Sequence, residues 1–307
     1  GNNEDLCRCL SNLGLLHFER GHYASAHRLY HDALEISTAI ASREFLLIVH
    51  INLAELHLSL GQMMLAEEEL KIAWDMAEQV DAGAQMAEIH ALRALILTER
   101  DDLAGARVEA ELALSLAEPT GNAETLVRVL QASGEVAYAS QEYMKARQSA
   151  RQARDVARWS RMLRFELLAA YDEARATWRE GDPLDAAHAL REISPRAEDG
   201  GFTPLAARIH GLLGEILWDS GDMGGAATEF IRAADQMKEI IATLSEEDRR
   251  SFVHHPEWKG AIGNLLDTLM RLGRREEALA YLIPLGVGSC EVDSSRAREA
   301  IPMKAAT

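Results

Sequence analysis

Apolar residues along most of this chain recur with helical periodicity, and short polar turns interrupt the pattern at regular intervals. On both sides of each turn the apolar positions are spaced i, i+3, i+4 and i+7, the pattern of one buried face of an α-helix. The clearest turns are ERGHY around Gly21, SLGQM around Gly61, REGDP around Gly181 and DSGDM around Gly221. The pattern therefore predicts pairs of antiparallel helices joined by tight turns.

The pairs repeat with a period of 40 residues. ERDDL at 101 and ASQEY at 141 fill the turn slot without glycine, and a seventh turn, RLGRR with Gly273, follows the sixth after 52 residues. Five positions after each turn stands an alanine: Ala26, Ala66, Ala106, Ala146, Ala186, Ala226 and Ala278. Seven positions before the turn six copies have a small residue: Gly14, Ala54, Ala94, Gly134, Ala174 and Gly214. Small residues at fixed places let two helix backbones approach closely.

No single pair can bury its apolar face alone, so successive pairs must stack. We expect an all-α fold, an α-solenoid of about seven antiparallel helix pairs with one elongated, gently curved surface. Residues 1–243 are expected to form six pairs of 40 residues, and residues 244–260 an inserted helical segment that Ser245 caps. Residues 261–285 are expected to form a seventh, capping pair, and residues 286–307 a mobile tail.

Residues 13–34, read as L-G-x(2)-H-F-x(2)-G-x-Y-x(2)-A-x(3)-Y-x(2)-A-L, resemble a tetratricopeptide repeat. The period is longer than the family's usual length of about 34. Longer repeats of this kind are similar to those of kinesin light chain, of the adaptor Pins and of bacterial multidomain signalling regulators. Gly1-Asn2 fills the slot between pairs that Gly121-Asn122 fills later. We therefore expect the sequence to begin inside a longer protein; a processed or tagged N-terminus is the alternative.

The chain is acidic, with a formal net charge of −17 and 48% hydrophobic residues. Such a surface disfavours nucleic acid and anionic membranes as partners and suits basic ones. No apolar run approaches the roughly 20 residues that cross a bilayer. Cys7, Cys9 and Cys290 are an odd number of cysteines, which fits reduced thiols. We expect a cytoplasmic protein that binds neither nucleic acid nor membrane.

Sequence motifs of catalysis and of cofactor binding are missing: the chain has no G-x(4)-G-K-[ST] and no H-E-x-x-H. His27 and His31 are four residues apart and could share a metal, but the sequence brings no further ligand to them. His50, His90 and His210 recur at one repeat position, where packing or capping is favoured over metal binding. We expect no cofactor, no metal and no enzymatic activity.

The resemblance implies that the first helix of each pair lines the concave face. In kinesin-light-chain-like repeats an asparagine two positions before the small residue holds the backbone of an extended peptide, and the chain has asparagine there only near its ends. Polar residues one position after the small residue and aromatic residues four positions after it share that face. The residues expected to contact a partner are Asn12, Phe18, Asn52, Glu55, Glu135, Tyr138, Arg175, Trp178, Glu215 and Trp218. The alternative is that the asparagines are simply exposed and the aromatic residues pack between repeats.

One segment of this acidic chain is rich in arginine at helical spacing: Arg147, Arg151, Arg154, Arg158, Arg161 and Arg164. We expect a loop near Trp159-Ser160 to split the series, and its members to pair with acidic neighbours. A docking site for an acidic partner is the alternative.

These features favour a scaffold that binds a protein or peptide segment on its concave face, within a larger regulatory protein. The alternative is a ligand-sensing domain that controls an upstream ATPase, kinase or DNA-binding module. A closed apolar pocket around Trp178 and Trp218 would favour sensing of a ligand, and an open groove would favour a peptide. Self-association through the terminal repeats is also possible, because the ends of a solenoid need a cap.

Overall fold

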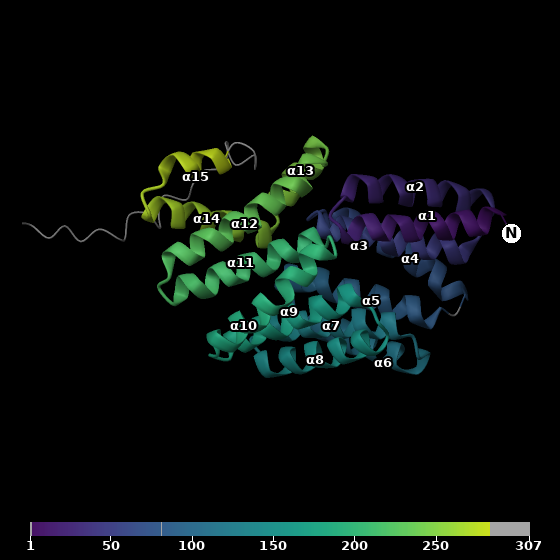
Figure 1. The fold of residues 1–307 in the computed structure, drawn as a ribbon. Helices are drawn as coiled ribbons and strands as arrows, with labels where there is room; N and C mark the ends of the chain where they lie inside the picture. The colour runs from purple at the N-terminus through teal and green to yellow at the C-terminus, as the bar shows by residue number, and fades with distance from the viewer. Residues whose placement is uncertain (1, 81, 283–307) are drawn as a thin grey trace, which may run out of the picture.

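The computed structural model describes residues 2–80 and 82–282, and in these residues it contains helices and no strands. Figure 1 shows the helices as a curved stack of antiparallel pairs. The α-helices are α1 (Asn2–Glu19), α2 (Tyr23–Ala39), α3 (Arg43–Ser59), α4 (Met63–Val80), α5 (Gly83–Glu99), α6 (Leu103–Ala117), α7 (Ala123–Ala139), α8 (Tyr143–Trp159), α9 (Leu163–Arg179), α10 (Pro183–Asp199), α11 (Thr203–Asp219), α12 (Met223–Ala242), α13 (Glu246–His254), α14 (Pro256–Arg271) and α15 (Arg275–Leu282). A 3-10 turn, η1 (Glu118–Thr120), follows α6. The chain is thus an all-α helical repeat solenoid, as the periodicity predicts.

The corners of the solenoid fall where the sequence places them. A residue with positive φ stands at each turn within a pair: Gly21, Gly61, Asp101, Gln141, Gly181, Gly221 and Gly273. A second set marks turns between pairs: Ala41, Gly121, Arg161 and Gly201. The left-handed residue ends one helix and turns the chain into the next.

Several helices begin with a side-chain cap on the first turn. Asp102, Asp182 and Asp222 each accept a hydrogen bond from the backbone N–H three residues later, at 2.9–3.2 Å. Ser245 caps α13 in the same way, accepting from the N–H of Asp248 at 3.1 Å. Each cap satisfies a donor that the helix itself leaves without a partner. The predicted cap at Ser245 is confirmed.

Small residues hold the two helices of each pair together. The seven alanines that follow the turns are all buried. Gly14 lies under the ring of Tyr30, and Gly214 lies under the ring of Phe230, so close that a Cβ at either glycine would overlap the ring. Since the aromatic ring fills the space that a side chain would take, these glycines set the distance between the two helices.

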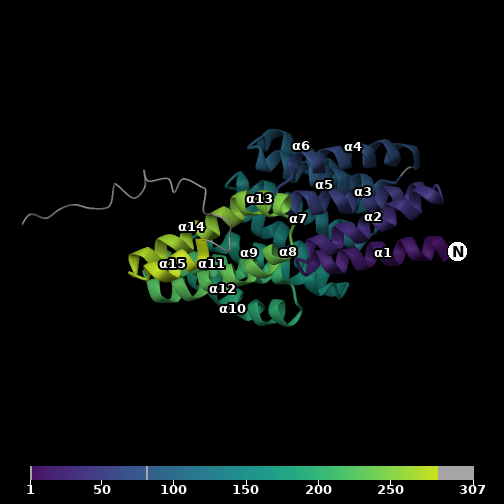
Figure 2. The same ribbon diagram turned by 90° about the horizontal axis from the view of Figure 1, so that it is seen from above.

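The stack curves more strongly than expected. One continuous core joins Tyr23 and Leu53 of the first two pairs to Met237 of α12 and Phe252 of α13. The rings of Tyr23 and Phe252 are 6.1 Å apart, and the Gln62 side-chain amide donates to Asp248 Oδ1 at 2.7 Å. Figures 1 and 2 both show α13 reaching towards the first helices. The array is therefore curved more tightly than the gently curved surface expected from the sequence, because α13 brings the late helices against the early ones.

After α13, Pro256 occupies the first turn of α14, where its missing N–H costs no helical hydrogen bond. Helices α14 and α15 pack on each other and α14 packs on α12. Residues 283–285 of the predicted seventh pair, and the predicted tail at 286–307, lie outside the described residues.

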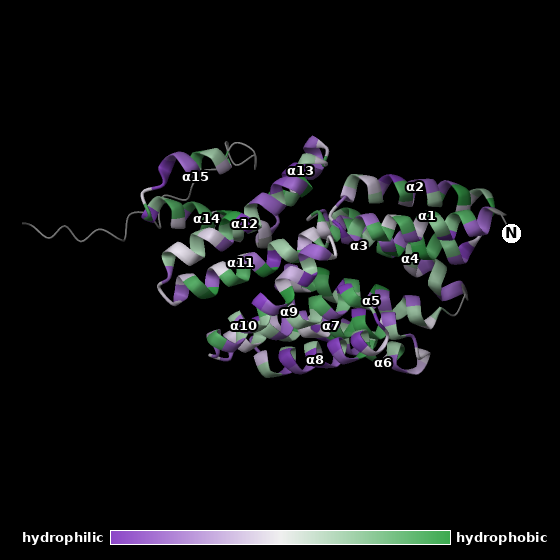
Figure 3. Cartoon of the chain, in the orientation of Figure 1, coloured by the Kyte–Doolittle hydropathy of each residue, from purple (hydrophilic) through white to green (hydrophobic). Residues whose placement is uncertain are grey.

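Polar and apolar residues are distributed along the helices as a solenoid requires. Figure 3 shows α8 and α13 as mainly hydrophilic and α3 and α5 as more hydrophobic. None of the helices in the described part of the chain is long and apolar enough to cross a membrane.

Candidate functional site

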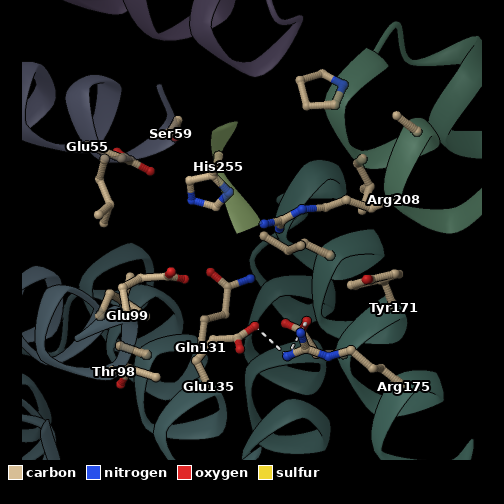
Figure 4. Close-up of a pocket in the computed structure, with 18 of the residues that line it drawn as sticks. Glu55, Ser59, Thr98, Glu99, Gln131, Glu135, Tyr171, Arg175, Arg208 and His255 are labelled. Carbon is tan, nitrogen blue, oxygen red and sulfur yellow. Dashed lines mark hydrogen bonds and ion pairs between the residues drawn. The ribbon is translucent and has the colours of Figure 1, made fainter. Parts of the chain in front are cut away.

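A cavity of about 550 Å³ lies on the concave side of the solenoid. Its walls come from the first helices of successive pairs, α1, α3, α5, α7, α9 and α11, and from the start of α14. Figure 4 shows side chains from these helices converging on it from two sides. The cavity exists because the array curves round on itself, so that helices far apart in sequence face one another.

Charged side chains line the cavity on several of its helices. In Figure 4, Glu55 of α3 lies across the cavity from Arg175 of α9 and Arg208 of α11, and His255 lies between them. Arg175 reaches Glu135 of α7 and donates to its Oε1 at 2.5 Å. Asp172 of α9 and Glu215 of α11 also line the cavity, so the arginine side presents both donors and acceptors.

Arg128 of α7 is a deeply buried cation of the site. Its guanidinium donates to Glu55 Oε2 at 2.7 Å and to Glu124 Oε1 at 3.1 Å, and it lies 5.2 Å from the centre of the Phe165 ring. Burial by itself lowers the pKa of Arg128, but the carboxylates of Glu55 and Glu88 outweigh burial and raise it. This arginine is permanently charged and ties α3 to α7.

Two carboxylates at the same end of the cavity are held in a poorly solvated environment. Burial raises the pKa of Glu88, although the cation of Arg128 and a 2.7 Å hydrogen bond from Thr125 Oγ1 oppose the shift. Burial also raises the pKa of Glu19, whose carboxylate is 3.8 Å from the guanidinium of Arg164. For both carboxylates, the effect of burial on the pKa is larger than the opposing effect of the nearby arginines.

Arg175 forms the centre of a second cluster. Its guanidinium lies 4.0 Å from the centre of the Tyr138 ring and 5.8 Å from that of Tyr171. Burial lowers its pKa, but Glu135, together with Tyr171 and Asp172, raises it. The arginine is thereby held against two aromatic rings, with its guanidinium directed at Glu135.

Three buried polar atoms of the site lack a hydrogen-bond partner in the described part of the protein. They are Gln131 Nε2, Arg175 Nε and His255 Nδ1. All three residues line the cavity, and Figure 4 shows Gln131 extending into it from α7. A buried donor without a partner is costly, so such atoms mark places where a bound molecule can supply acceptors.

Two family models match the chain, both described as tetratricopeptide repeat, over residues 6–45 and residues 171–239. With the 40-residue helix pairs and their left-handed corners, these matches decide the family. The chain contains tetratricopeptide repeats. No curated protein sequence matches it.

Solved structures similar to the tetratricopeptide-repeat array share its fold. A Rap protein complexed with Competence and Sporulation Factor is 15% identical, with a TM-score of 0.58, covering 92% of this chain and 78% of that one. NprR in complex with its cognate peptide NprX is 13% identical, with a TM-score of 0.58, covering 96% and 79%. A Signal Transduction ATPase with Numerous Domains from Pyrococcus horikoshii, which has a tetratricopeptide repeat sensor, is 14% identical, with a TM-score of 0.58, covering 92% and 48%. This chain thus corresponds to about half of that ATPase.

The structure brings seven of the ten predicted contact residues to the cavity wall: Phe18, Glu55, Glu135, Tyr138, Arg175, Trp178 and Glu215. Asn12 is exposed on α1, and neither it nor Asn52 is among the lining residues. Trp218 also lies off the cavity wall: it packs against the core of α12 and α14, with the guanidinium of Arg271 4.9 Å from its ring centre. The two tryptophans therefore do not share one pocket.

Sequence reasoning missed cavity residues that lie one and two helical turns before the predicted contact residues, on the first helices of the pairs. Glu88, Arg128 and Arg208 occupy one repeat position, and Gln131 and Gly211 occupy another three residues later; all five line the cavity. The signal was available, because positions i, i+3, i+7 and i+11 fall on one helix face. His255 could not be found in this way, since it belongs to the insertion.

The histidines at one repeat position have structural partners. His50, His90 and His210 each contact, through Nδ1, a glutamate 19 residues later on the second helix of the pair, at 2.5–2.6 Å. The favoured packing role is thus confirmed for these histidines. Nε2 of His27 lies 3.2 Å from Nε2 of His31, and among the described residues no group of three metal-binding side chains converges.

The arginine series is divided, as expected, because α8 ends at Trp159. Arg147 pairs with Glu180 at 2.8 Å, and Arg151 and Arg154 both pair with Glu173 at 2.5 Å. Paired arginines on an outer face leave little charge for an acidic partner.

Proposed function

We propose that this tetratricopeptide-repeat array is a recognition region that binds an extended peptide, or a peptide segment of a protein partner, in its concave cavity. Its role is to hold a partner within a larger cytoplasmic regulatory protein, and not to catalyse a reaction. The observation that carries the proposal is the cavity of about 550 Å³, on whose wall buried donors lack a partner among the residues that the structure describes. Backbone carbonyl groups of an extended peptide are acceptors of the required kind.

The lining supports a peptide more than a small apolar ligand. Apolar surfaces such as Phe18 and Leu95 alternate with charged groups such as Glu55 and Arg175 around the cavity. Pockets for small molecules are mostly apolar, with few polar groups. A peptide offers both backbone polar groups and apolar side chains, so it matches the mixture. The similar Rap and NprR structures, which were solved with bound factors or peptides, are consistent with this proposal.

A sensing role is the second candidate, and one observation favours it. His255 lines the cavity and follows α13, which contacts the first helix pairs through Phe252 and Asp248. A molecule in the cavity would touch both the wall and the segment that closes the array. Binding could therefore change the closure and signal to an upstream ATPase, kinase or DNA-binding module.

Cavity filling at Gly211 provides the test. Gly211 lies inside α11 and lines the cavity, and a Cβ added there meets no atom within 4 Å. Gly211→Leu therefore occupies the cavity without displacing the helix. Gly263→Leu is the matched control, because Gly263 is an exposed helical glycine with equally open surroundings outside the cavity. Both changes favour the helix by up to about 1 kcal/mol.

The probes are peptides selected from a phage-displayed random heptapeptide library on the wild-type array. We expect Gly211→Leu to weaken their binding at least tenfold in fluorescence anisotropy, while Gly263→Leu leaves the affinity unchanged. Thermal unfolding should show both variants at least as stable as the wild type. Failure to select any peptide, or selected peptides that bind Gly211→Leu normally, would refute a peptide-binding role for the cavity.

A further inference from the structure

The charges around the cavity do not balance at one end. Four carboxylates line the wall formed by α1, α3 and α5, and we call them the acidic wall: Glu19, Glu55, Glu88 and Glu99. Two guanidiniums, Arg128 and Arg164, face it from α7 and α9. Arg128 is shared further with Glu124, which lies outside the cavity lining. Among the described lining residues this end therefore has four carboxylates to two guanidiniums.

The rest of the lining is more evenly charged. Arg175 and Arg208 come from α9 and α11, and His255 comes from the segment before α14 (Figure 4). Glu135, Asp172 and Glu215 line the same part of the cavity. The surplus of carboxylates over guanidiniums is therefore found at the acidic wall, and a molecule that fills the cavity meets a negative field there.

We propose that the peptide in this cavity carries a cationic group, a lysine or arginine side chain or a free amine, that lies against the acidic wall. This inference rests on the proposed peptide-binding function and adds the chemistry of the bound segment. The cation completes the neutralisation that Arg128 and Arg164 leave unfinished.

The state of two carboxylates supports the assignment. Burial raises the pKa values of Glu19 and Glu88, which means that the ionised forms of these two carboxylates are disfavoured in the cavity wall. A cation within about 4–6 Å of a carboxylate favours its ionised form. An anionic ligand group would instead add repulsion to groups that are already poorly solvated.

The aromatic rings at this end hold one of the protein's own cations. Phe18 and Phe165 line this end of the cavity, and the guanidinium of Arg164 lies 5.7 Å and 5.3 Å from their ring centres. Because both rings are buried, recognition of a bound cation falls to the carboxylates. At longer range, the formal net charge of −17 raises the local concentration of cationic peptides.

Three synthetic hexapeptide libraries test the inference, all acetylated and amidated at their ends and differing only in a fixed central residue: arginine, norleucine or glutamate. A fourth library has norleucine and a free N-terminal amine, so that an amine is distinguished from a side chain. The matched protein variants are Glu88→Gln, whose amide oxygen still accepts from Thr125, and Glu35→Gln on the exposed face of α2.

We expect the arginine or free-amine library to bind wild type at least tenfold more tightly than acetylated norleucine, and the glutamate library to bind most weakly. Glu88→Gln should reduce that preference several-fold, and Glu35→Gln should not alter it. If norleucine peptides bind as tightly as cationic ones, the inference is wrong while the peptide-binding function stands. Equal effects of the two variants would also overturn it. If no library binds, both proposals fail together.

Discussion

Residues in the left-handed region stand at all seven turns within helix pairs and at four of the turns between pairs, and not all of them are glycine. Asp101 and Gln141 have φ of 63° and 60° at turns within pairs, and Ala41 and Arg161 have φ of 53° and 59° between pairs. A side chain in this region costs roughly 1–2 kcal/mol, whereas glycine adopts it freely. The repeat geometry is therefore strong enough to impose the corner on residues that resist it.

Gln141→Gly tests that interpretation. Removing the side chain relieves the strain but adds freedom to the unfolded chain, so we expect the free energy of unfolding to rise by about 0.5–1 kcal/mol. Gly181→Gln at the equivalent corner, where a Cβ meets no atom within 4 Å, should lower it by a similar amount. Urea unfolding measures both. A loss of stability in Gln141→Gly would show that the glutamine side chain stabilises the turn.

His210 is a buried residue whose charge state depends on two glutamates. Its Nδ1 lies 2.6 Å from Glu229 Oε2 and its Nε2 lies 2.7 Å from Glu198 Oε1, so both ring nitrogens face acceptors. Both can donate only in the imidazolium form. Burial lowers the pKa of His210, but the hydrogen bonds from its ring to Glu229 and Glu198 outweigh burial and raise it.

A raised pKa of His210 has a defined effect on stability. The folded protein holds the proton more tightly than the unfolded one, so the contribution is complete below the ordinary pKa near 6.5 and is lost as the pH rises through the folded value. We expect the wild type to lose more unfolding free energy between pH 6 and pH 9 than His210→Gln does. His254→Gln on the exposed face of α13 is the control and should keep the wild-type slope. Parallel curves for wild type and His210→Gln would contradict this account.

Within a helix pair, the small residue of the first helix and the ring of the second form one packing unit. A Cβ on Gly214 would come within 2.5 Å of the Phe230 ring, while a Cβ on Gly134 in the equivalent place would meet the Ser149 Cβ at 3.6 Å. Phe230 is fully buried and cannot move aside easily. The same sequence position thus tolerates a methyl group in one pair and not in another.

Alanine substitutions separate these two cases. Gly134→Ala should raise the free energy of unfolding by up to about 1 kcal/mol, because alanine favours the helix and fits in ordinary contact. Gly214→Ala should lower it by about 1–2 kcal/mol, because the overlap with Phe230 outweighs the gain in helix propensity. Thermal and urea unfolding measure both variants. Equal effects of the two substitutions would mean that the ring does not set the helix spacing.

Helix pairing, corners and period could be predicted from the sequence because they are local properties that repeat. Turn residues such as Gly21 and alanines such as Ala26 stand at fixed spacing, and each repeat supports the others. The contact residues were predicted less completely. The predicted contact residues lie in the later part of each first helix. Arg128 and Gln131, in the earlier part of α7, line the cavity on the same helix face as Glu135 but were not predicted.

The closure of the whole array could not be predicted, because it depends on contacts between segments about 200 residues apart. Gln62 and Asp248 are separated by 186 positions, and no periodicity links them. Likewise, Trp178 and Trp218 share a repeat position, yet only Trp178 lines the cavity. The core of α12 and α14 incorporates Trp218 instead, which is a consequence of the insertion and the last pair.

Phe252 of α13 is the residue that best tests the closure. It is fully buried and contacts the rings of Tyr23 and Trp258, at 6.1 Å and 5.2 Å between centroids. Phe252→Ala should lower the free energy of unfolding by about 3–5 kcal/mol. It should also let the late helices separate from the early ones. Small-angle X-ray scattering should then report a larger radius of gyration.

Leu190→Ala in α10 is the control for Phe252→Ala. Leu190 is equally buried, but it belongs to the core of neighbouring repeats and not to the closure. It should lower stability while leaving the radius of gyration unchanged. An unchanged radius in Phe252→Ala, with α13 still protected from proteolysis, would show that α13 does not hold the array closed.

The central claim is that the concave cavity receives the peptide, and hydrogen–deuterium exchange measures this most directly. The measurement compares the wild-type array alone with the array saturated by its best phage-selected heptapeptide. The account predicts slower exchange in α3, α5, α7 and α9 and in the segment around His255, with little change in α4, α6, α8 and α10. Slower exchange confined to those second helices, with the first helices unaffected, would contradict it.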